Sequence, residues 1–157
     1  MQITTNQTYE MKNVISYRAK MTQVQINQIM KQLSDFISEN DLTKSGCFTT
    51  STFAVENINN QPVMDIELLC PVDREITLPS GFTFKSTFRL NNAVKIVHTG
   101  NPALMQSTVN ELTEFLKSNH LTPVTSIYNV TVVEPKSQQE IDSMVVDMYI
   151  GVSQNIL

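Results

Sequence analysis

The chain has 157 residues, of which 41% are hydrophobic and 17% charged, and its formal net charge at pH 7 is −4. This composition excludes intrinsic disorder, and the acidic balance argues against nucleic acid as a partner, because phosphate neutralisation needs clustered Lys and Arg. No apolar run is long enough to span a bilayer, and the polar segment Met1–Glu10 contains no hydrophobic signal. We therefore expect a cytoplasmic protein without nucleic-acid binding or membrane insertion.

The first half of the chain is predicted to be strand, helix, strand, strand. The helix covers 23–39, where apolar residues recur with the helical period, and Thr22 with Gln25 has the spacing of a capping box. The strand segments are rich in β-branched and aromatic residues, and the last two are joined by a turn of Asn and Gln. These predicted strands are 9–21, 46–56 and 62–70.

The second half repeats this succession after a linker over 71–81, which Pro and Gly punctuate. Asn101 is a natural N-cap and Pro102 a natural first residue for a helix over 102–119. The strands of this half are predicted at 82–99, 125–134 and 144–152, with a turn over 135–139.

An internal repeat links the two halves. The helix segment LSDFISENDL, which begins at Leu33, matches LTEFLKSNHL, which begins at Leu112, with Phe36 opposite Phe115. The strand Asp65–Leu68 matches Asp147–Ile150 at a slightly longer spacing. The sequence therefore predicts an α+β protein of two pseudo-symmetric β-α-β-β repeats, about 9–70 and 82–153, in a single domain over 1–157. We expect the halves to share one core, because each helix has one apolar face that needs covering.

The residues whose side chains could act in catalysis or metal binding form no recognisable catalytic site in the sequence. His98 and His120 stand at opposite ends of the second helix and cannot share a metal there, and Cys47 and Cys70 lie in strand-like runs typical of buried thiols. Asp65 and Glu67 lie two residues apart on one strand face, and two like charges there indicate a solvated face. We expect no metal, no cofactor and no catalytic residues.

Several short motifs give the chain a resemblance to a known family. They are Val97-His98-Thr99-Gly100 before the second helix, Ser126-Ile127-Tyr128-Asn129-Val130 after it, the turn Glu134-Pro135 and the last strand Asp147-Met148-Tyr149-Ile150. In this order they resemble the gyrase-inhibitory-protein-like family, also found as the effector-binding domain of multidrug-responsive transcription regulators.

This resemblance implies a curved antiparallel sheet with two helices packed on one face and a ligand cleft between the halves. It implies a non-catalytic module that binds a small apolar molecule there, and the candidate ligand-binding residues are Tyr17, Phe53, Phe84, Tyr128, Asn129 and Tyr149. Asn129 stands at the position of the family's pocket glutamate, and a neutral amide cannot neutralise a buried cation.

Two alternatives stay open at this point. A looser resemblance to small stand-alone Gram-positive proteins of this fold, some encoded among type VII secretion and toxin genes, implies an adaptor or chaperone with a protein partner. An enzyme would need acid and base groups positioned in the cleft. The fold does not decide between these functions, and the sequence gives no oligomeric state.

Overall fold

The structure, a computed structural model, describes residues 2–154, and the chain divides into two compact units. The first unit is Glu10–Phe88, and the second is Arg89–Leu157 together with Met1–Tyr9. Each unit contains a helix and antiparallel strands, so the predicted α+β class is confirmed. No helix of the described residues is long and apolar enough to cross a membrane.

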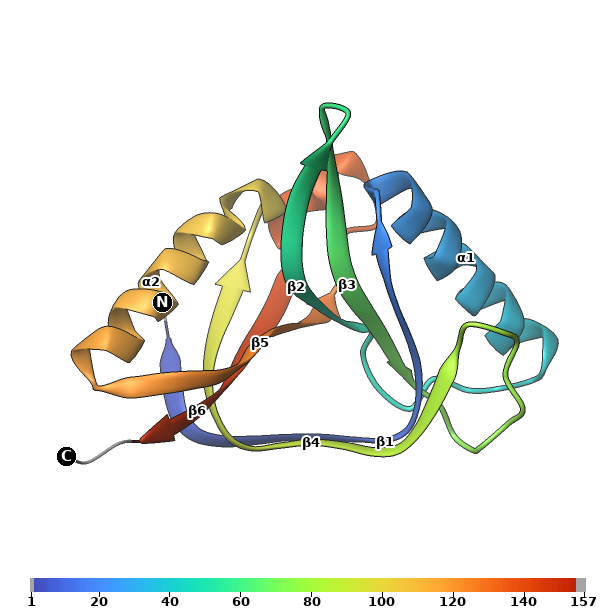
Figure 1. Cartoon of the computed structure of the whole chain (residues 1–157), viewed down its shortest axis with the longest axis horizontal. Coiled ribbons are helices and arrows are strands. Elements are labelled where there is room, and N and C mark those ends of the chain that lie inside the picture. Colours follow the sequence, from blue (N-terminus) through green and yellow to red (C-terminus); the bar gives the residue numbers. More distant parts are fainter. Residues whose placement is uncertain (1, 155–157) are drawn as a thin grey trace. The chain divides into compact units, whose positions relative to one another are not determined.

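The first unit is a three-stranded antiparallel sheet with one helix against it (Figure 1). Strand β3 pairs with β1 on one side and with β2 on the other, and β2 and β3 meet at a tight turn in which Asn59 and Asn60 both have positive φ. Asn tolerates this conformation, which a two-residue hairpin requires. The elements are β1 (Ile3–Met21) from Glu10 onward, α1 (Gln23–Glu39), β2 (Thr49–Ile58) and β3 (Gln61–Pro71). The start of β4 (Thr83–Thr99), up to Phe88, also belongs to this unit.

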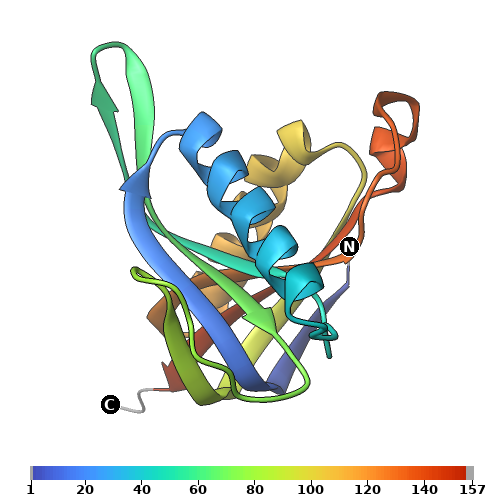
Figure 2. The same ribbon diagram turned by 90° about the vertical axis from the view of Figure 1, so that its right-hand side faces the viewer.

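Helix α1 begins and ends at the predicted residues. The capping box is present: the Gln25 amide donates to Thr22 Oγ1 at 3.3 Å, and the Thr22 amide donates to Gln25 Oε1 at 2.9 Å. Its apolar stripe packs against one face of the sheet. Figure 2 shows α1 on the side of the molecule that faces the viewer. The buried residues of this stripe are Ile26, Leu33 and Ile37.

In the second unit, β6 pairs antiparallel with both β4 and β5. Its helix carries Leu112 and Leu116 into a core formed with β4 and β6. The elements are β4 (Thr83–Thr99), a 3-10 helix η1 (Pro102–Leu104), α2 (Met105–Ser118), β5 (Leu121–Val133), a 3-10 helix η2 (Gln138–Ser143) and β6 (Val145–Gln154).

Three predictions about local structure need correction. The α-helix expected from 102 begins only at Met105, because the Asn101 side chain caps a 3-10 turn, accepting from Ala103 N at 2.9 Å. The segment after Pro135, expected to be a simple turn, contains η2. Strand β1 begins at Ile3, well before the expected start, although its first residues are mostly polar.

The two helices end in the same way. Asn40 and Asn119 are the C-caps, and the side-chain amide of each donates to the carbonyl of Phe36 or Phe115 at 2.9 Å. The repeat also aligns Val14-Ile15-Ser16-Tyr17 with Ala93-Val94-Lys95-Ile96, so Ile96 is the counterpart of Tyr17. The strand pairing agrees less closely: Tyr17 pairs with Leu68, whereas Ile96 pairs with Met148 and not with Ile150, which matches Leu68 in the sequence. This shift of two residues keeps every side chain on its face, because the period of a strand is two.

Candidate functional site

In each unit the helix covers one face of the sheet, and the opposite face carries charged and aromatic side chains. In β3, Ile66 and Leu68 pack toward α1, so Asp65 and Glu67 point away from it. In β6, Val146, Met148 and Ile150 pack toward α2, which places Asp147 and Tyr149 on the other face. We call these the polar faces of the first and second unit.

Glu67 is the buried carboxylate of the first polar face. Its side chain is only 9% exposed. Oε2 accepts a hydrogen bond from the Ser16 hydroxyl at 2.7 Å and from the Lys85 ammonium at 2.7 Å. Burying a carboxylate is costly unless a counter-charge and hydrogen bonds compensate, and Ser16 and Lys85 supply both. The prediction of a simply solvated face is therefore wrong for Glu67.

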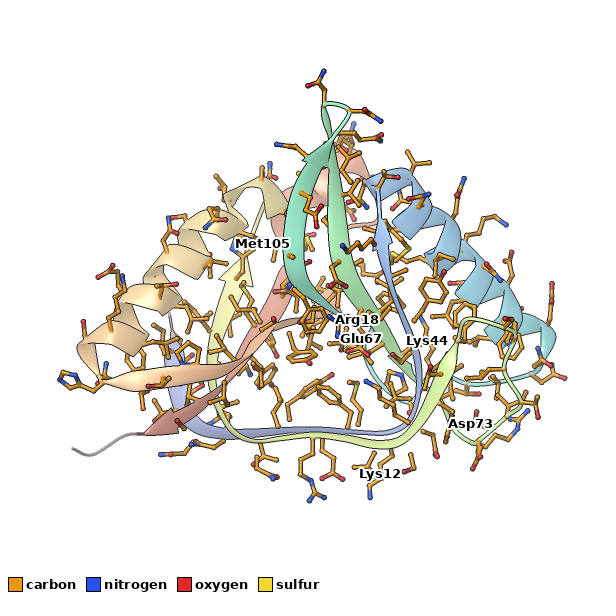
Figure 3. The ribbon with its side chains drawn as sticks, viewed as in Figure 1. Lys12, Arg18, Lys44, Glu67, Asp73 and Met105 are labelled. Carbon is orange, nitrogen blue, oxygen red and sulfur yellow. The ribbon has the colours of Figure 1, made fainter. Side chains whose placement is uncertain are left out.

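Arg18 lies next to Glu67 on the neighbouring strand (Figure 3). Its guanidinium donates to both carboxylate oxygens of Asp65, at 3.1 and 3.2 Å, and lies 3.9 Å from the centre of the Phe53 ring. The hydrogen bonds from Arg18 hold the pKa of Asp65 below its usual value. Phe53 sits where the pairing of β2 with β3 is interrupted by a bulge, a device that often re-aims a side chain.

The second polar face is built around tyrosines. Tyr128 and Tyr149 are direct partners on β5 and β6, and Tyr9 stacks on Tyr149 with ring centres 4.7 Å apart. Lys95 Nζ lies 5.7 Å from the centre of the Tyr149 ring and 3.3 Å from Asp147. Burial raises the pKa of Tyr149, against an opposing effect of Lys95. Both faces thus contain a cation that contacts an aromatic ring and an aspartate.

The candidate residues from the sequence fall on different faces. Tyr17 points toward α1, where it packs near Met21 and Ile66 and lies 5.0 Å from the Phe82 ring. Asn129 pairs with Met148, and this places it on the α2 side, opposite its neighbour Tyr128.

Of the remaining candidates, the structure brings Tyr128 and Tyr149 together in the second unit and places Phe53 on the polar face of the first. Phe84 is half-buried in β4. The ligand-binding role of all six residues stays a prediction.

The carbonyl oxygen of Asn129 is fully buried and accepts no hydrogen bond. Buried side-chain oxygens are ordinarily hydrogen-bonded, and among the described residues this one has no protein partner. Its position against the α2-side core makes it part of the packing of the second unit rather than of the polar face.

Sequence reasoning missed five polar-face residues: Tyr9, Arg18, Glu67, Lys85 and Lys95. The available signal was the strand period, since Arg18 lies two residues from Ser16, as Glu67 does from Asp65. The two-residue period of a strand does not, however, predict which strands are neighbours in the sheet.

His98 is a structural histidine. Its Nε2 donates to the Asn101 carbonyl at 3.1 Å, and its Nδ1 lies 2.7 Å from the Thr108 hydroxyl, within hydrogen-bond distance. It borders an open groove of about 500 Å³ with Thr99, Leu104 and Ser107, but both ring nitrogens are already used. Gly100 follows with φ of 112°, a backbone conformation that favours glycine.

Within residues 2–154, no three His, Cys, Asp or Glu side chains are grouped so that they could hold a metal ion.

Known structures share this fold. The C-terminal domain of EcmrR superposes with a TM-score of 0.76 at 16% identity, over 99% of this chain and 100% of that domain. In the complex of EcmrR with DNA the TM-score is also 0.76, at 14% identity over 98% of this chain, which spans only 58% of the EcmrR chain there.

Two more distant structures carry different descriptions. A hydrolase from Listeria innocua has a TM-score of 0.63 at 11% identity, over 94% of this chain and 92% of that one. SAV2435, solved bound to tetraphenylphosphonium, has a TM-score of 0.52 at 8% identity, over 97% and 93% of the two chains. At these identities the similarity shows a shared fold.

No curated protein matches the chain. Residues 10–154 match the family described as a domain of unknown function, DUF5085. This match covers both units except for the start of β1. The chain therefore belongs to the DUF5085 family.

Proposed function

We propose that this chain is a non-catalytic module that binds a small apolar, aromatic molecule against its polar faces. The observation that carries the proposal is the composition of these faces, in which aromatic rings stand beside charged groups that are already paired. Ligand sites typically combine apolar and aromatic lining with a few placed polar groups. Tyr149 with Tyr9 in one unit and Phe53 in the other provide such rings.

The shared fold supports this proposal. SAV2435 has this fold and was solved with tetraphenylphosphonium, which is an apolar aromatic cation. The resemblance to effector-binding domains points to the same class of ligand. For this chain we propose the same use of the fold, in which the ligand stacks on tyrosine and phenylalanine rings.

An enzymatic role is less well supported by the geometry, although a hydrolase of Listeria innocua shares the fold. Ser16 donates its hydroxyl proton to Glu67 at 2.7 Å, which is the pairing of a nucleophile with a base. Ser16 is only 3% exposed, however, and Glu67 is occupied by Lys85. A substrate could not reach this hydroxyl without displacing its surroundings. The alternative of an adaptor for type VII secretion gains no support from the proteins that share this fold.

The test is titration of the protein with aromatic compounds of similar shape and different charge. Tetraphenylphosphonium and tetraphenylborate differ in charge but hardly in size, and triphenylphosphine oxide is a smaller neutral analogue. We expect saturable one-to-one binding of at least one of them by calorimetry. At about 100 times Kd the bound ligand should stabilise the protein by about 2.7 kcal/mol in thermal unfolding.

Two variants connect binding to the aromatic rings. Tyr149→Leu and Phe53→Leu keep an apolar side chain but remove the ring, and we expect at least one of them to weaken binding by about 0.5–1.5 kcal/mol, the value of an aromatic contact beyond its area. Val24→Ala, at a side chain on α1 that is 60% exposed, is the control and should bind as the wild type does. If none of the three compounds binds, or if both ring variants bind normally, the proposal is wrong.

A further inference from the structure

The ammonium group of Lys85 occupies the position on Glu67 that a cationic ligand would take. Glu67 Oε2 is 2.7 Å from Lys85 Nζ, and the Glu67 side chain is 9% exposed. A buried carboxylate attracts a cation strongly, because leaving its charge unpaired is costly and hydrogen bonds between charged groups are strong. In this chain, however, the ammonium group of Lys85 already occupies the position beside the Glu67 carboxylate.

The neighbouring charges on this polar face are paired as well. Arg18 holds both oxygens of Asp65, so Asp65 is not available as a second anion. The hydroxyl of Ser16 also donates a hydrogen bond to the Glu67 carboxylate, which leaves it fewer positions for accepting further hydrogen bonds. An incoming cation therefore meets a face that is electrically neutral, and it gains no net attraction unless one of the internal cations leaves.

Lys85 is the internal cation that can leave. Its side chain is 36% exposed, whereas that of Glu67 is 9% exposed. A lysine has a flexible four-carbon stem, and its ammonium is well hydrated in water. Arg18 is held more firmly, because its planar guanidinium binds Asp65 with two hydrogen bonds and also stacks on Phe53.

We propose that Lys85 is a specificity-determining residue: its ammonium acts as a built-in competitor that makes the first polar face select neutral or anionic aromatic ligands over cationic ones. This inference rests on the proposed function, since it concerns the ligand class of the same face. The presence of Asn129 in place of a pocket glutamate is a different reason for weak cation binding, because it means that a carboxylate is missing. On the first polar face the carboxylate of Glu67 is present and buried, but it is already paired with Lys85.

The test is the substitution Lys85→Met, which keeps the length and apolar body of the side chain and removes its charge. We expect the affinity for tetraphenylphosphonium to rise by about tenfold or more, which corresponds to about 1.4 kcal/mol, because the cation no longer competes with an internal ammonium. The affinity for tetraphenylborate should stay equal or fall, so the ratio of the two dissociation constants reports the change in selectivity.

Three further variants isolate the charge pair. Lys85→Arg keeps the competitor and should bind tetraphenylphosphonium like the wild type. Lys85→Met combined with Glu67→Gln removes both charges and should lose the gain. Lys12→Met makes the same change at a lysine of this unit that is 66% exposed (Figure 3) and should have no effect. Circular dichroism and the thermal midpoint establish that each variant is folded.

The outcomes separate this inference from the proposed function. If the wild type binds one of the compounds but Lys85→Met gains no affinity for the cation, the inference is overturned and the binding function stands. If the double variant keeps the gain, Glu67 is not the group that Lys85 blocks, and the inference is again overturned. If no variant binds any of the compounds, both proposals fail.

Discussion

At the scale of single residues, Gly151 has no room for a side chain. A Cβ atom there would lie 2.8 Å from Cγ2 of Thr125 and 3.2 Å from its Oγ1. The Gly151 amide donates to the same Oγ1 at 2.9 Å, so Thr125 cannot move away without losing this bond. The close approach occurs where the register of β5 with β6 shifts between Pro123 and Ile127.

We therefore expect Gly151→Ala to destabilise the protein by about 1–3 kcal/mol, the usual cost of overpacking, measured by urea unfolding. Thr125→Ser removes the clashing methyl group and keeps the hydroxyl, so the double variant should recover most of the loss. Equal stability of Gly151→Ala and the wild type would show that the strands can separate at low cost.

The two cysteines differ in reactivity. Cys70 is fully buried, and burial raises the pKa of its thiol from 9.0 to about 11, while Cys47 is partly exposed. Because the thiolate is the reactive form, we expect iodoacetamide at pH 8 to modify Cys47 in the native protein and to modify Cys70 only after unfolding. Mass spectrometry of peptides measures this, and equal rates at both sites would contradict it.

The raised pKa of Cys70 also has a consequence for stability. Because the folded value lies above the unfolded one, the preference for the neutral thiol contributes its full stability below about pH 9, and this is lost as the pH rises through about 11. Comparing Cys70→Ala with the wild type isolates the effect, since the variant should lose less stability over this range.

At the scale of elements, both helices depend on polar groups at their ends. Thr22 begins α1 with a complete capping box, and Asn40 and Asn119 end α1 and α2 with the same side-chain bond to a carbonyl. The sequence predicts the capping box of Thr22 with Gln25, because the two residues are only three positions apart. The predicted start of α1 is confirmed for this reason. The C-caps Asn40 and Asn119 were not predicted.

We expect Thr22→Ala to lower the free energy of unfolding by about 0.5–2 kcal/mol, the typical cost of losing an N-cap. Thr22→Ser keeps the hydroxyl that accepts from Gln25 and should retain nearly all of the stability. Chemical denaturation of both variants gives the comparison, and similar losses in the two would mean that the methyl group of Thr22, not its hydroxyl, is important.

At the scale of the whole molecule, the two units do not follow each other along the chain. The second unit takes Met1–Tyr9 from the other end of the sequence. Within this segment, Ile3 packs against the core of the second unit, Thr8 donates to the Asn91 carbonyl at 3.2 Å, and Tyr9 stacks on Tyr149. The repeat limits expected from the sequence, 9–70 and 82–153, leave this segment out.

We expect a fragment of residues 82–157 to be unstable, because it lacks the strand segment at 3–9. The same fragment with residues 1–9 attached through a flexible Gly-Ser linker should be more stable. Circular dichroism and thermal unfolding of the two fragments measure this. Identical stability would mean that the N-terminal segment contributes nothing to the second unit.

Features with local causes follow from the amino-acid sequence alone. The capping box of α1, the apolar stripes of both helices, the succession of strands and helices along the chain and the α+β class could be predicted, because each depends on residues within one or two turns or on a period of two along a strand. The start of β1 could not, since its polar residues form a strand only through pairing.

Which side chains meet on the polar faces depends on how the strands pair in three dimensions. Ser16, Glu67 and Lys85 come from three strands, and nothing near Glu67 in the sequence indicates that its charge is compensated. Tyr128 and Asn129, adjacent in the sequence, point to opposite faces, while Tyr9 and Tyr149 are stacked. The physical reason is that burial of a charge or a ring depends on neighbours across the sheet, and strand pairing brings these together over long sequence separations.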